Sequence, residues 1–463
     1  MNSITRSIPP EGWTGIDTIV FSSLSKWIDD LYHSEVISLG AALLGKQLIV
    51  SSALTDDKHA LACVYIADCV RYMERTEVET EVFENLSNQA VEDVVLALNG
   101  VILLFTPLDW LLSIRQYDST VTDHEEDLCR KLFVNLSSHP NYYRLRADNL
   151  AAACLFYVGH APNLIPSKTG WRFVLSEELV TIVRDMIEGE PSTLRRFISP
   201  SYPKSLPPVT ILSKIAEGSY STVMSALSSN VVIAIKIQAM NDEAIREMAI
   251  ACTLSHPNVQ SWIGFTFSSQ GNLNARMTLQ PDTLWGLIYK NHSFDQAMQQ
   301  SDRVWIDGAS SPFDLVSLLT RRKFARELLQ ALSYLKDMKI VHGDLKPDNL
   351  FISGEGTLLV SDFGISVAYA EPLLTTVPTS DIRYALEYRD PNVESKIFSF
   401  EADVWAAAVI ILEMETGILP AAADPNLNFN SIGDWSLVYV CKQMLLRDVY
   451  TRITARQALV MLE

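Results

Sequence analysis

Hydrophobic residues recur at intervals of three and four positions through the first 190 residues of the chain. This spacing places apolar side chains on one face of an α-helix, so it predicts an all-helical region. The clearest runs are Val36, Leu39, Gly40 and Leu43; Val94, Leu98, Val101, Ile102 and Phe105; and Ala151, Cys154, Leu155 and Val158. Beyond residue 208 the pattern changes to β-branched runs such as Val209-Thr-Ile-Leu and Val231-Val-Ile-Ala-Ile, and it becomes helical again after about residue 313. The second part is therefore predicted to combine α and β structure.

A proline-rich segment separates these two parts. Five prolines occur between residues 189 and 208 among serines and charged residues, a composition that favours extended structure over a packed element. A chain of 463 residues is also too long for one hydrophobic core. We therefore predict an N-terminal arm at residues 1–19, helical domains at 20–118 and 119–188, a linker at 189–208, and an α+β domain at 209–463.

Composition narrows the class of protein. Acidic residues outnumber basic ones, 55 to 37, and the formal net charge of −18 argues against a nucleic acid or an anionic membrane as the main partner. The six cysteines form no CxxC pair, so we expect reduced core residues. The start of the chain lacks a signal-peptide pattern, and the apolar stretch 94–112 is interrupted by Asn99, Pro107 and Asp109. We expect an intracellular protein, cytoplasmic or nuclear, without a transmembrane segment.

Two segments early in the second part could hold a nucleotide. Between two strand-like runs lies Ile215-Ala-Glu-Gly218-Ser-Tyr-Ser-Thr-Val223, where the backbone amides of a tight hairpin could cover phosphates. Lys236 ends the apolar run Ile233-Ala-Ile-Lys236. A buried ammonium group requires a carboxylate or a phosphate nearby, and Glu247 on the next predicted helix could supply it.

Two further segments carry the strongest chemical signal. They are Val341-His-Gly-Asp344-Leu-Lys346-Pro-Asp-Asn349 and, after a predicted strand, Ser361-Asp362-Phe-Gly364. Together with the nucleotide segments, they resemble the pattern of eukaryotic protein kinases over residues 209–462. The resemblance implies a bilobal α+β fold, with an N-lobe at about residues 209–280 and a C-lobe at about 281–463, that transfers the γ-phosphate of ATP to protein hydroxyls with Mg²⁺.

The resemblance also implies roles for individual residues. Asp344 would accept the proton of the substrate hydroxyl, Lys346 would steady the γ-phosphate, and Asn349 and Asp362 would hold Mg²⁺. The residues implied around the nucleotide are Ile215, Gly218, Val223, Ala234, Lys236, Glu247, Met277, Leu279 and Asp362, with Met277 as the gatekeeper. Ala216 and Ser221 replace two of the three glycines that the family has over the phosphates.

A narrower resemblance concerns the helix around Glu247. Ala244-Ile-Arg-Glu247 and the following His256-Pro-Asn-Val are similar to the C-helix region of cyclin-dependent kinases, the helix that a cyclin holds. Residues 20–118 and 119–188 in turn resemble the two helical domains of a cyclin. This implies a monomeric serine/threonine kinase that acts on protein substrates and carries its own activator. The cyclin lysine and glutamate that hold the C-helix correspond to Cys69 and Glu92, so only the acid is kept, although Arg71 could substitute for the lysine.

Several departures from the family pattern bear on regulation. Ser380 has the position of the regulatory phosphothreonine, but Gly343 and Val367 replace two of the arginines that bind its phosphate, which leaves Arg246. We therefore expect activity that does not depend on phosphorylation of this loop. Where the family pairs a glutamate with a late arginine, this chain has Asn392, and Arg452 is expected to use Glu394 or solvent.

Two other functions remain open on the sequence. Five departures, at Ala216, Ser221, Gly343, Ala385 and Asn392, would also suit a pseudokinase scaffold that binds partners, with or without ATP, and transfers no phosphate. A third interpretation is an adaptor whose helical part binds other proteins. None of the five departures removes the proton acceptor or a metal ligand, which favours the active kinase.

Overall fold

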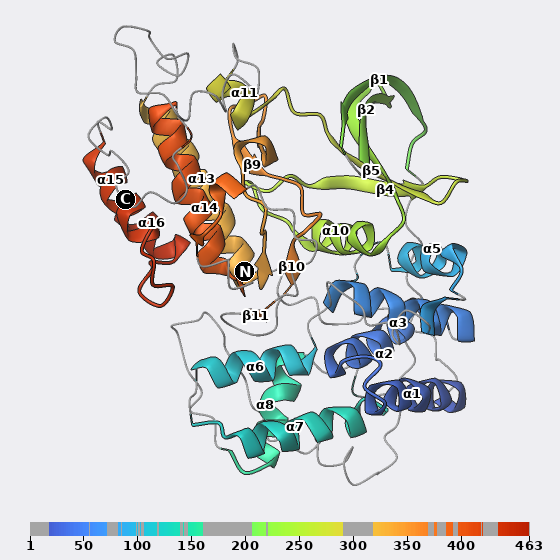
Figure 1. Cartoon of the computed structure of the whole chain (residues 1–463). Coiled ribbons are helices and arrows are strands. Elements are labelled where there is room, and N and C mark those ends of the chain that lie inside the picture. Colours follow the sequence, from blue (N-terminus) through green and yellow to red (C-terminus); the bar gives the residue numbers. More distant parts are fainter. Residues whose placement is uncertain are drawn as a thin grey trace, which may run out of the picture.

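The computed structural model describes most of the chain in two packed parts. The described residues are 18–54, 56–71, 82–84, 86–98, 100, 102, 106–117, 120–138, 142, 147–160, 206–218, 221–289, 318–368, 375–376, 386–391, 397–417, 419 and 434–462. Figure 1 shows a group of helices, drawn in blue and cyan, that lies against a sheet and a second helical group later in the chain.

The N-terminal part contains helices and no strand within the described residues up to 160, as the apolar spacing predicts. The helices are α1 (Thr18–His33), α2 (Leu39–Ser52), α3 (Asp57–Arg71), α5 (Asn88–Ala97), α6 (Pro107–Tyr117), α7 (Asp123–Leu136) and α8 (Ala147–Tyr157). Side-chain caps start α2, α5 and α7, at Ser38, Ser87 and Thr122. The apolar stretch 94–112 divides between α5 and α6, as expected. The predicted second helical domain continues to residue 188, beyond the described residues.

A buried lysine joins three of these helices. Lys46 of α2 is fully buried, and its Nζ lies 2.5 Å from Asp29 Oδ1 of α1 and 2.9 Å from Ser137 Oγ after α7. Burial lowers the pKa of Lys46, against the opposing effect of Asp29. Because Ser137 belongs to the predicted second helical domain, this contact links the two predicted helical domains.

The second part begins with a five-stranded antiparallel sheet of order β1-β2-β3-β5-β4. Its strands are β1 (Val209–Glu217), β2 (Ser221–Ser228), β3 (Val231–Ala239), β4 (Trp262–Phe267) and β5 (Asn272–Thr278), with helix α10 (Asp242–Thr253) between β3 and β4. The β2 to β3 turn uses Ser229 and Asn230, both at positive φ, which matches the twist of a two-residue hairpin. Asn241 caps α10 by accepting from the Ala244 N–H.

A helical lobe follows the sheet. It contains β6 (Asp282–Thr283), α11 (Leu284–Tyr289), α13 (Leu318–Asp337), β7 (Ile340–Val341), a 3-10 turn (Pro347–Asn349), β8 (Leu350–Ile352), β9 (Leu358–Val360), β10 (Val367–Ala368), β11 (Thr375–Thr376), a 3-10 turn (Leu386–Tyr388), β12 (Ile397–Phe398), α14 (Phe400–Thr416), α15 (Trp435–Met444) and α16 (Ala455–Met461). Helix α14 is buried along nearly its whole length, so it forms the centre of this lobe. Its Gly417 cap has φ +69°, a conformation that favours glycine.

Arg452 is anchored differently from the sequence expectation. Glu394 lies outside the described residues, and the Nη1 of Arg452 pairs instead with Asp390, so the expectation of Glu394 or solvent was wrong. Both side chains are buried, and Arg452 also donates to the Glu401 carbonyl at 2.7 Å and lies 5.0 Å from the Trp405 ring centre. Asp390 lies two positions before Asn392, and its carboxylate compensates the buried charge of Arg452.

The expectation of reduced cysteines in the core is confirmed. All six cysteines are free, and each is buried except the partly buried Cys252. No helix in the described part of the chain is long and apolar enough to cross a membrane.

The two parts meet where α3 packs against α10. The Tyr65 hydroxyl of α3 donates to Asp242 Oδ1 at 2.6 Å, and Arg246 Nε of α10 donates to the Cys69 carbonyl at 2.9 Å. Glu92, the acid that the cyclin resemblance suggested for holding this helix, makes no hydrogen bond or ion pair with any described residue. The helix is therefore held by Tyr65 and a main-chain carbonyl instead of by Glu92.

Gly100 lies against the second part of the chain with no room for a side chain. It has φ +71°, and a Cβ atom there would lie 2.7 Å both from Cys252 Sγ of α10 and from Phe265 of β4. Any side chain at this position would therefore collide with the sheet domain.

The end of the linker is also bound to the sheet. Leu206 lies over Gly264 of β4, where a Cβ atom would be 2.8 Å from Leu206 Cδ1. Arg276 of β5 donates from Nη1 to the Pro207 carbonyl at 2.5 Å.

Candidate active site

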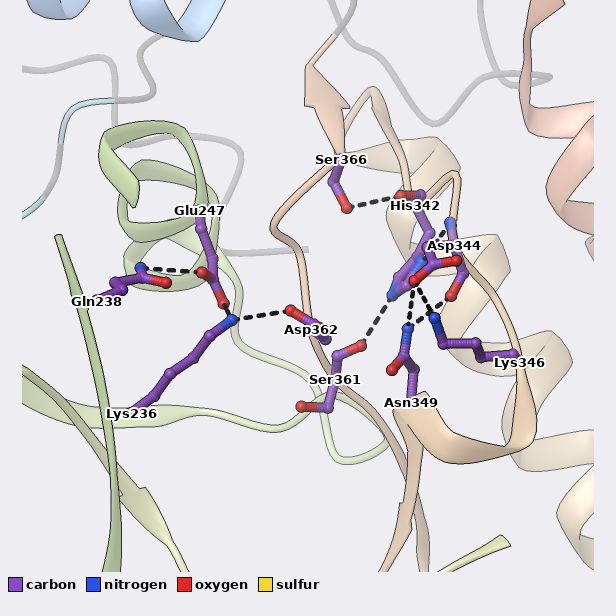
Figure 2. A network of polar contacts seen from close by, with 10 residues as sticks. All are labelled: Lys236, Gln238, Glu247, His342, Asp344, Lys346, Asn349, Ser361, Asp362 and Ser366. Atoms are coloured by element: carbon purple, nitrogen blue, oxygen red, sulfur yellow. Dashed lines mark hydrogen bonds and ion pairs between the residues drawn. The ribbon is translucent and has the colours of Figure 1, made fainter. Parts of the chain in front are cut away.

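Three charged side chains from separate segments meet beside α10 (Figure 2). Lys236 comes from β3, and its Nζ lies 2.7 Å from Glu247 Oε1 and 2.9 Å from Asp362 Oδ1. Gln238 Nε2 donates to the other oxygen of Glu247 at 3.1 Å. Burial lowers the pKa of Lys236, but the charges of Glu247 and Asp362 outweigh this effect and raise the pKa above its usual value. Lys236 is therefore a fixed cation.

Regular local structure produces this cluster. Lys236 and Gln238 are two positions apart on β3, so their side chains leave the same face of the strand. Glu247 lies one turn into α10, where the buried Ile245, Met248 and Ala249 fix the rotation of the helix. The alternating strand and the apolar helix stripe are both visible in the sequence.

A nonpolar cluster adjoins Lys236 on the same sheet. Ala234 pairs with Met277 across β3 and β5, and the cluster consists of Ala234, Ala275, Met277, Val223, Trp262 and Leu279. Four of these residues were predicted around the nucleotide. Ile215 is about half exposed, at 47%, and lies outside the cluster. The Gly218 N–H donates to the Ser221 carbonyl at 2.8 Å, which closes the hairpin that was predicted over the phosphates.

The loop after β7 presents a carboxylate with one unused oxygen. Asp344 Oδ2 accepts from Lys346 Nζ at 2.6 Å and from Asn349 Nδ2 at 3.0 Å. The same Asn349 nitrogen donates to the Asp344 carbonyl at 2.7 Å, which curls the loop back on itself. Asp344 Oδ1 is buried and has no hydrogen-bond partner. A buried acceptor without a donor is costly, so this atom is suited to a group that the protein itself does not supply.

The backbone of this loop is fixed by α14. Asp403 accepts from the N–H of His342 at 2.7 Å and from the N–H of Gly343 at 2.9 Å. Gly343 has φ +78°, where glycine is strongly favoured. The sequence interpretation treated Gly343 as a lost arginine, whereas the structure shows that this position also needs an unusual backbone conformation.

A family model described as the protein kinase domain matches residues 209–461, more than half of the 463-residue chain. The chain belongs to the protein kinase family. The match begins at Val209, where β1 begins, and extends to Met461, where α16 ends. A kinase domain uses ATP and Mg²⁺ and acts on protein substrates in general.

The kinase domain offers oxygen ligands that suit Mg²⁺. Because Asn349 Nδ2 is used by Asp344, the Oδ1 atom of Asn349 remains an acceptor. Asp362 uses Oδ1 for Lys236 and keeps Oδ2. Amide and carboxylate oxygens are the ligands that Mg²⁺ prefers, so Asn349 and Asp362 fit this ion.

Asp362 is held in a strained conformation. It has φ +64°, which costs a residue other than glycine about 1–3 kcal/mol. Desolvation raises the pKa of Asp362, but Lys236 outweighs it and lowers the pKa below the usual value. The kinase domain thus keeps this carboxylate ionised at neutral pH.

Sequence reasoning missed several residues that build the site. The sequence assigned no role to Gln238, and the resemblance placed Asp403-Val-Trp405 at the start of a helix without assigning the Asp403 carboxylate to the catalytic loop. The glycine at 343 was the one available signal for a left-handed backbone. Ser380, Arg383 and Ala385 lie outside the described residues.

We predict that Lys236→Met lowers the free energy of unfolding by about 3 kcal/mol near pH 8, because it leaves the buried Glu247 without its cation. The loss should be smaller near about pH 5. Burial raises the pKa of Glu247, so in the variant this carboxyl takes up a proton as the pH falls and the folded state regains stability. Chemical unfolding at both pH values measures the difference.

The control is Lys214→Met, because the pair of Lys214 with Glu217 is exposed and should contribute less than about 1 kcal/mol. The double variant Lys236→Met/Glu247→Gln should recover most of the lost stability. An equal loss at both pH values would contradict the assignment.

Proposed function

We propose that this chain is a serine/threonine protein kinase whose N-terminal helical part activates the kinase domain in cis. The observation that carries the proposal is the buried, unpartnered Oδ1 of Asp344, whose other carboxylate oxygen is bonded to Lys346 and Asn349. The serine/threonine preference is supported by the resemblance of residues 244–259 to cyclin-dependent kinases. The domain layout from the sequence, with a linker at 189–208, is retained in this proposal.

The proposed chemistry follows from the free oxygen of Asp344. A substrate hydroxyl donates its hydrogen bond to Oδ1, and Asp344 takes the proton as the hydroxyl oxygen forms its bond to the γ-phosphorus of ATP. The bond from this phosphorus to the ADP oxygen breaks. Lys346, 2.6 Å from Asp344, places positive charge beside the transferred group, and Lys236 orients the remaining phosphates. Asn349 and Asp362 would hold Mg²⁺, which would supply positive charge against the phosphates.

Activation in cis is supported by the contact of α3 with α10. Glu247 can reach Lys236 only when α10 lies against the sheet, and α10 is bonded on its other side by Tyr65 and the Cys69 carbonyl. The N-terminal part therefore stabilises the position of α10 in which the Lys236 and Glu247 pair is complete. No separate activator is required in this proposal, and the chain works as a monomer.

Independence from loop phosphorylation is supported by the residues at positions 246, 343 and 367, where the family has arginines that bind the phosphate. Arg246 is 3% exposed and donates to the Cys69 carbonyl, so the N-terminal part already engages this cation. Gly343 has no side chain, and Val367 pairs with Val341 in the β10 to β7 ladder. A phosphate near Ser380 would find few cations in these positions.

The first prediction from the proposed function concerns phosphoryl transfer. Purified full-length chain should transfer labelled phosphate from magnesium ATP to a mixed protein substrate, and Asp344→Asn should lower the rate by about 10²–10⁴-fold without weakening ATP binding. Asp337→Asn, which changes an exposed aspartate of α13, is the control. No transfer by the unchanged chain, with ATP binding intact, would favour the pseudokinase scaffold.

The second prediction tests the activator. Gly100→Ala should lower the rate of transfer by about tenfold or more, because the new methyl group collides with Cys252 and Phe265 and overpacking costs about 1–3 kcal/mol. Gly159→Ala is the matched control, since Gly159 also has positive φ, at +96°, but has open space around its Cβ position. Equal losses in both variants would contradict activation through this interface.

The third prediction concerns the loop. Ser380→Ala should keep the rate within about twofold of the unchanged chain, because no arginine cluster depends on a phosphate there. The rate is measured on protein treated with phosphatase and on untreated protein. A folded Ser380→Ala chain without activity would refute this independence.

A further inference from the structure

Ser366 lies two residues after Gly364 and is fully buried. Its Oγ donates to the His342 carbonyl at 2.8 Å, and its own N–H donates to the Phe363 carbonyl at 3.1 Å (Figure 2). The hydroxyl thus connects the segment that contains Asp362 to the loop that contains Asp344. No motif in the sequence assigns a role to this residue.

His342 is hydrogen-bonded to four residues. Its N–H donates to Asp403 and its carbonyl accepts from Ser366. The Asp344 N–H donates to Nδ1 at 3.2 Å, so Nε2 carries the proton that is donated to the Ser361 carbonyl at 3.0 Å. Burial lowers the pKa of His342, which keeps this neutral form at neutral pH. Because His342 is fully buried, water cannot replace a lost partner.

Two of these hydrogen bonds lie on either side of Asp362 in the sequence. Ser361 and Ser366 lie on either side of Asp362-Phe363-Gly364, and both are bonded to His342. The Phe363 ring also lies 5.1 Å from the His342 ring. Both ends of the segment 361–366 are therefore hydrogen-bonded to His342. Removal of the Ser366 hydroxyl would leave only the bond at Ser361.

The same segment leads directly into the interface with the N-terminal part. Strand β10 starts at the next residue, Val367, and pairs with β7 immediately before His342. Helix α3 packs against β10 as well as against α10. The N-terminal part thus supports the catalytic loop through β10, in addition to its contact with α10.

We propose that Ser366 is a positioning residue for phosphoryl transfer. Its bond to the His342 carbonyl fixes the Asp362 segment against the Asp344 loop and holds it there without a loop phosphate. This inference assumes the kinase activity proposed above. Because Ser366 is fully buried, its hydroxyl is not open to substrate or nucleotide, and its effect falls on the alignment of the two carboxylates and not on binding.

The test compares the full-length chain with Ser366→Ala and Ser366→Thr, with rates normalised to the fraction that binds magnesium ADP. Ser366→Ala should lower kcat by about tenfold, while the KM values for ATP and for peptide stay within about twofold. Ser366→Thr, which keeps the hydroxyl, should restore most of kcat. Ser52→Ala is the control, because Ser52 is a buried serine of α2 whose hydroxyl donates to the Ile49 carbonyl at 3.3 Å.

Hydrogen exchange gives a second readout that needs no substrate. Ser366→Ala should speed amide exchange at residues 342–344 and 362–366, and Ser52→Ala should not. An inactive unchanged chain with this exchange difference would refute the kinase activity and leave the bond to His342 supported. Unchanged kcat in an active chain, an equal loss in Ser52→Ala, or no rescue by threonine would each overturn the proposal.

Discussion

The contact between the N-terminal part and the kinase domain depends on two adjacent buried charges on α10. Arg246 and Glu247 are each 3% exposed, and neighbouring residues of a helix point in different directions. Glu247 is compensated by Lys236 within the kinase domain, and Arg246 by the Cys69 carbonyl of the N-terminal part. A buried charge without a partner costs several kcal/mol, roughly 3–5 when one member of a pair is lost. The helix therefore reaches its lowest free energy only when both of its sides are occupied.

The same helix bears on two departures from the kinase pattern that the sequence comparison identified. Gly343 and Val367 remove cations from the loop region, and the remaining Arg246 faces the N-terminal part. The segment after Asp362 is secured by uncharged contacts, the Ser366 hydroxyl and the β10 to β7 ladder. Main-chain and hydroxyl contacts thus hold the segment that follows Asp362.

Much of the fold and of the candidate site followed from the sequence, because local patterns determine it. Helical spacing predicted the N-terminal part, alternation predicted β3, and the segments at 341–349 and 361–364 placed Asp344, Asn349 and Asp362 in one region. What the sequence missed depends on contacts between distant residues. Asp390 could not be chosen over Glu394 for Arg452 without the fold, and no sequence pattern indicated that Lys46 is fully buried. Glu92 was selected by position, whereas the contact at α10 uses a carbonyl group that no sequence pattern identifies.

The bound end of the linker has a consequence for pairing between molecules. Leu206 packs over Gly264, and the Pro207 carbonyl accepts a hydrogen bond from Arg276. The residues that precede β1 are therefore fixed against the sheet. When one end of a connection is fixed, the attached domain has fewer positions available to it. This raises the effective concentration of the helical part near the α10 of its own chain. A helical part from a second molecule must compete at the ordinary protein concentration. In the activation in cis proposed above, the small contact at Leu206 would favour closure within one chain over domain exchange between two.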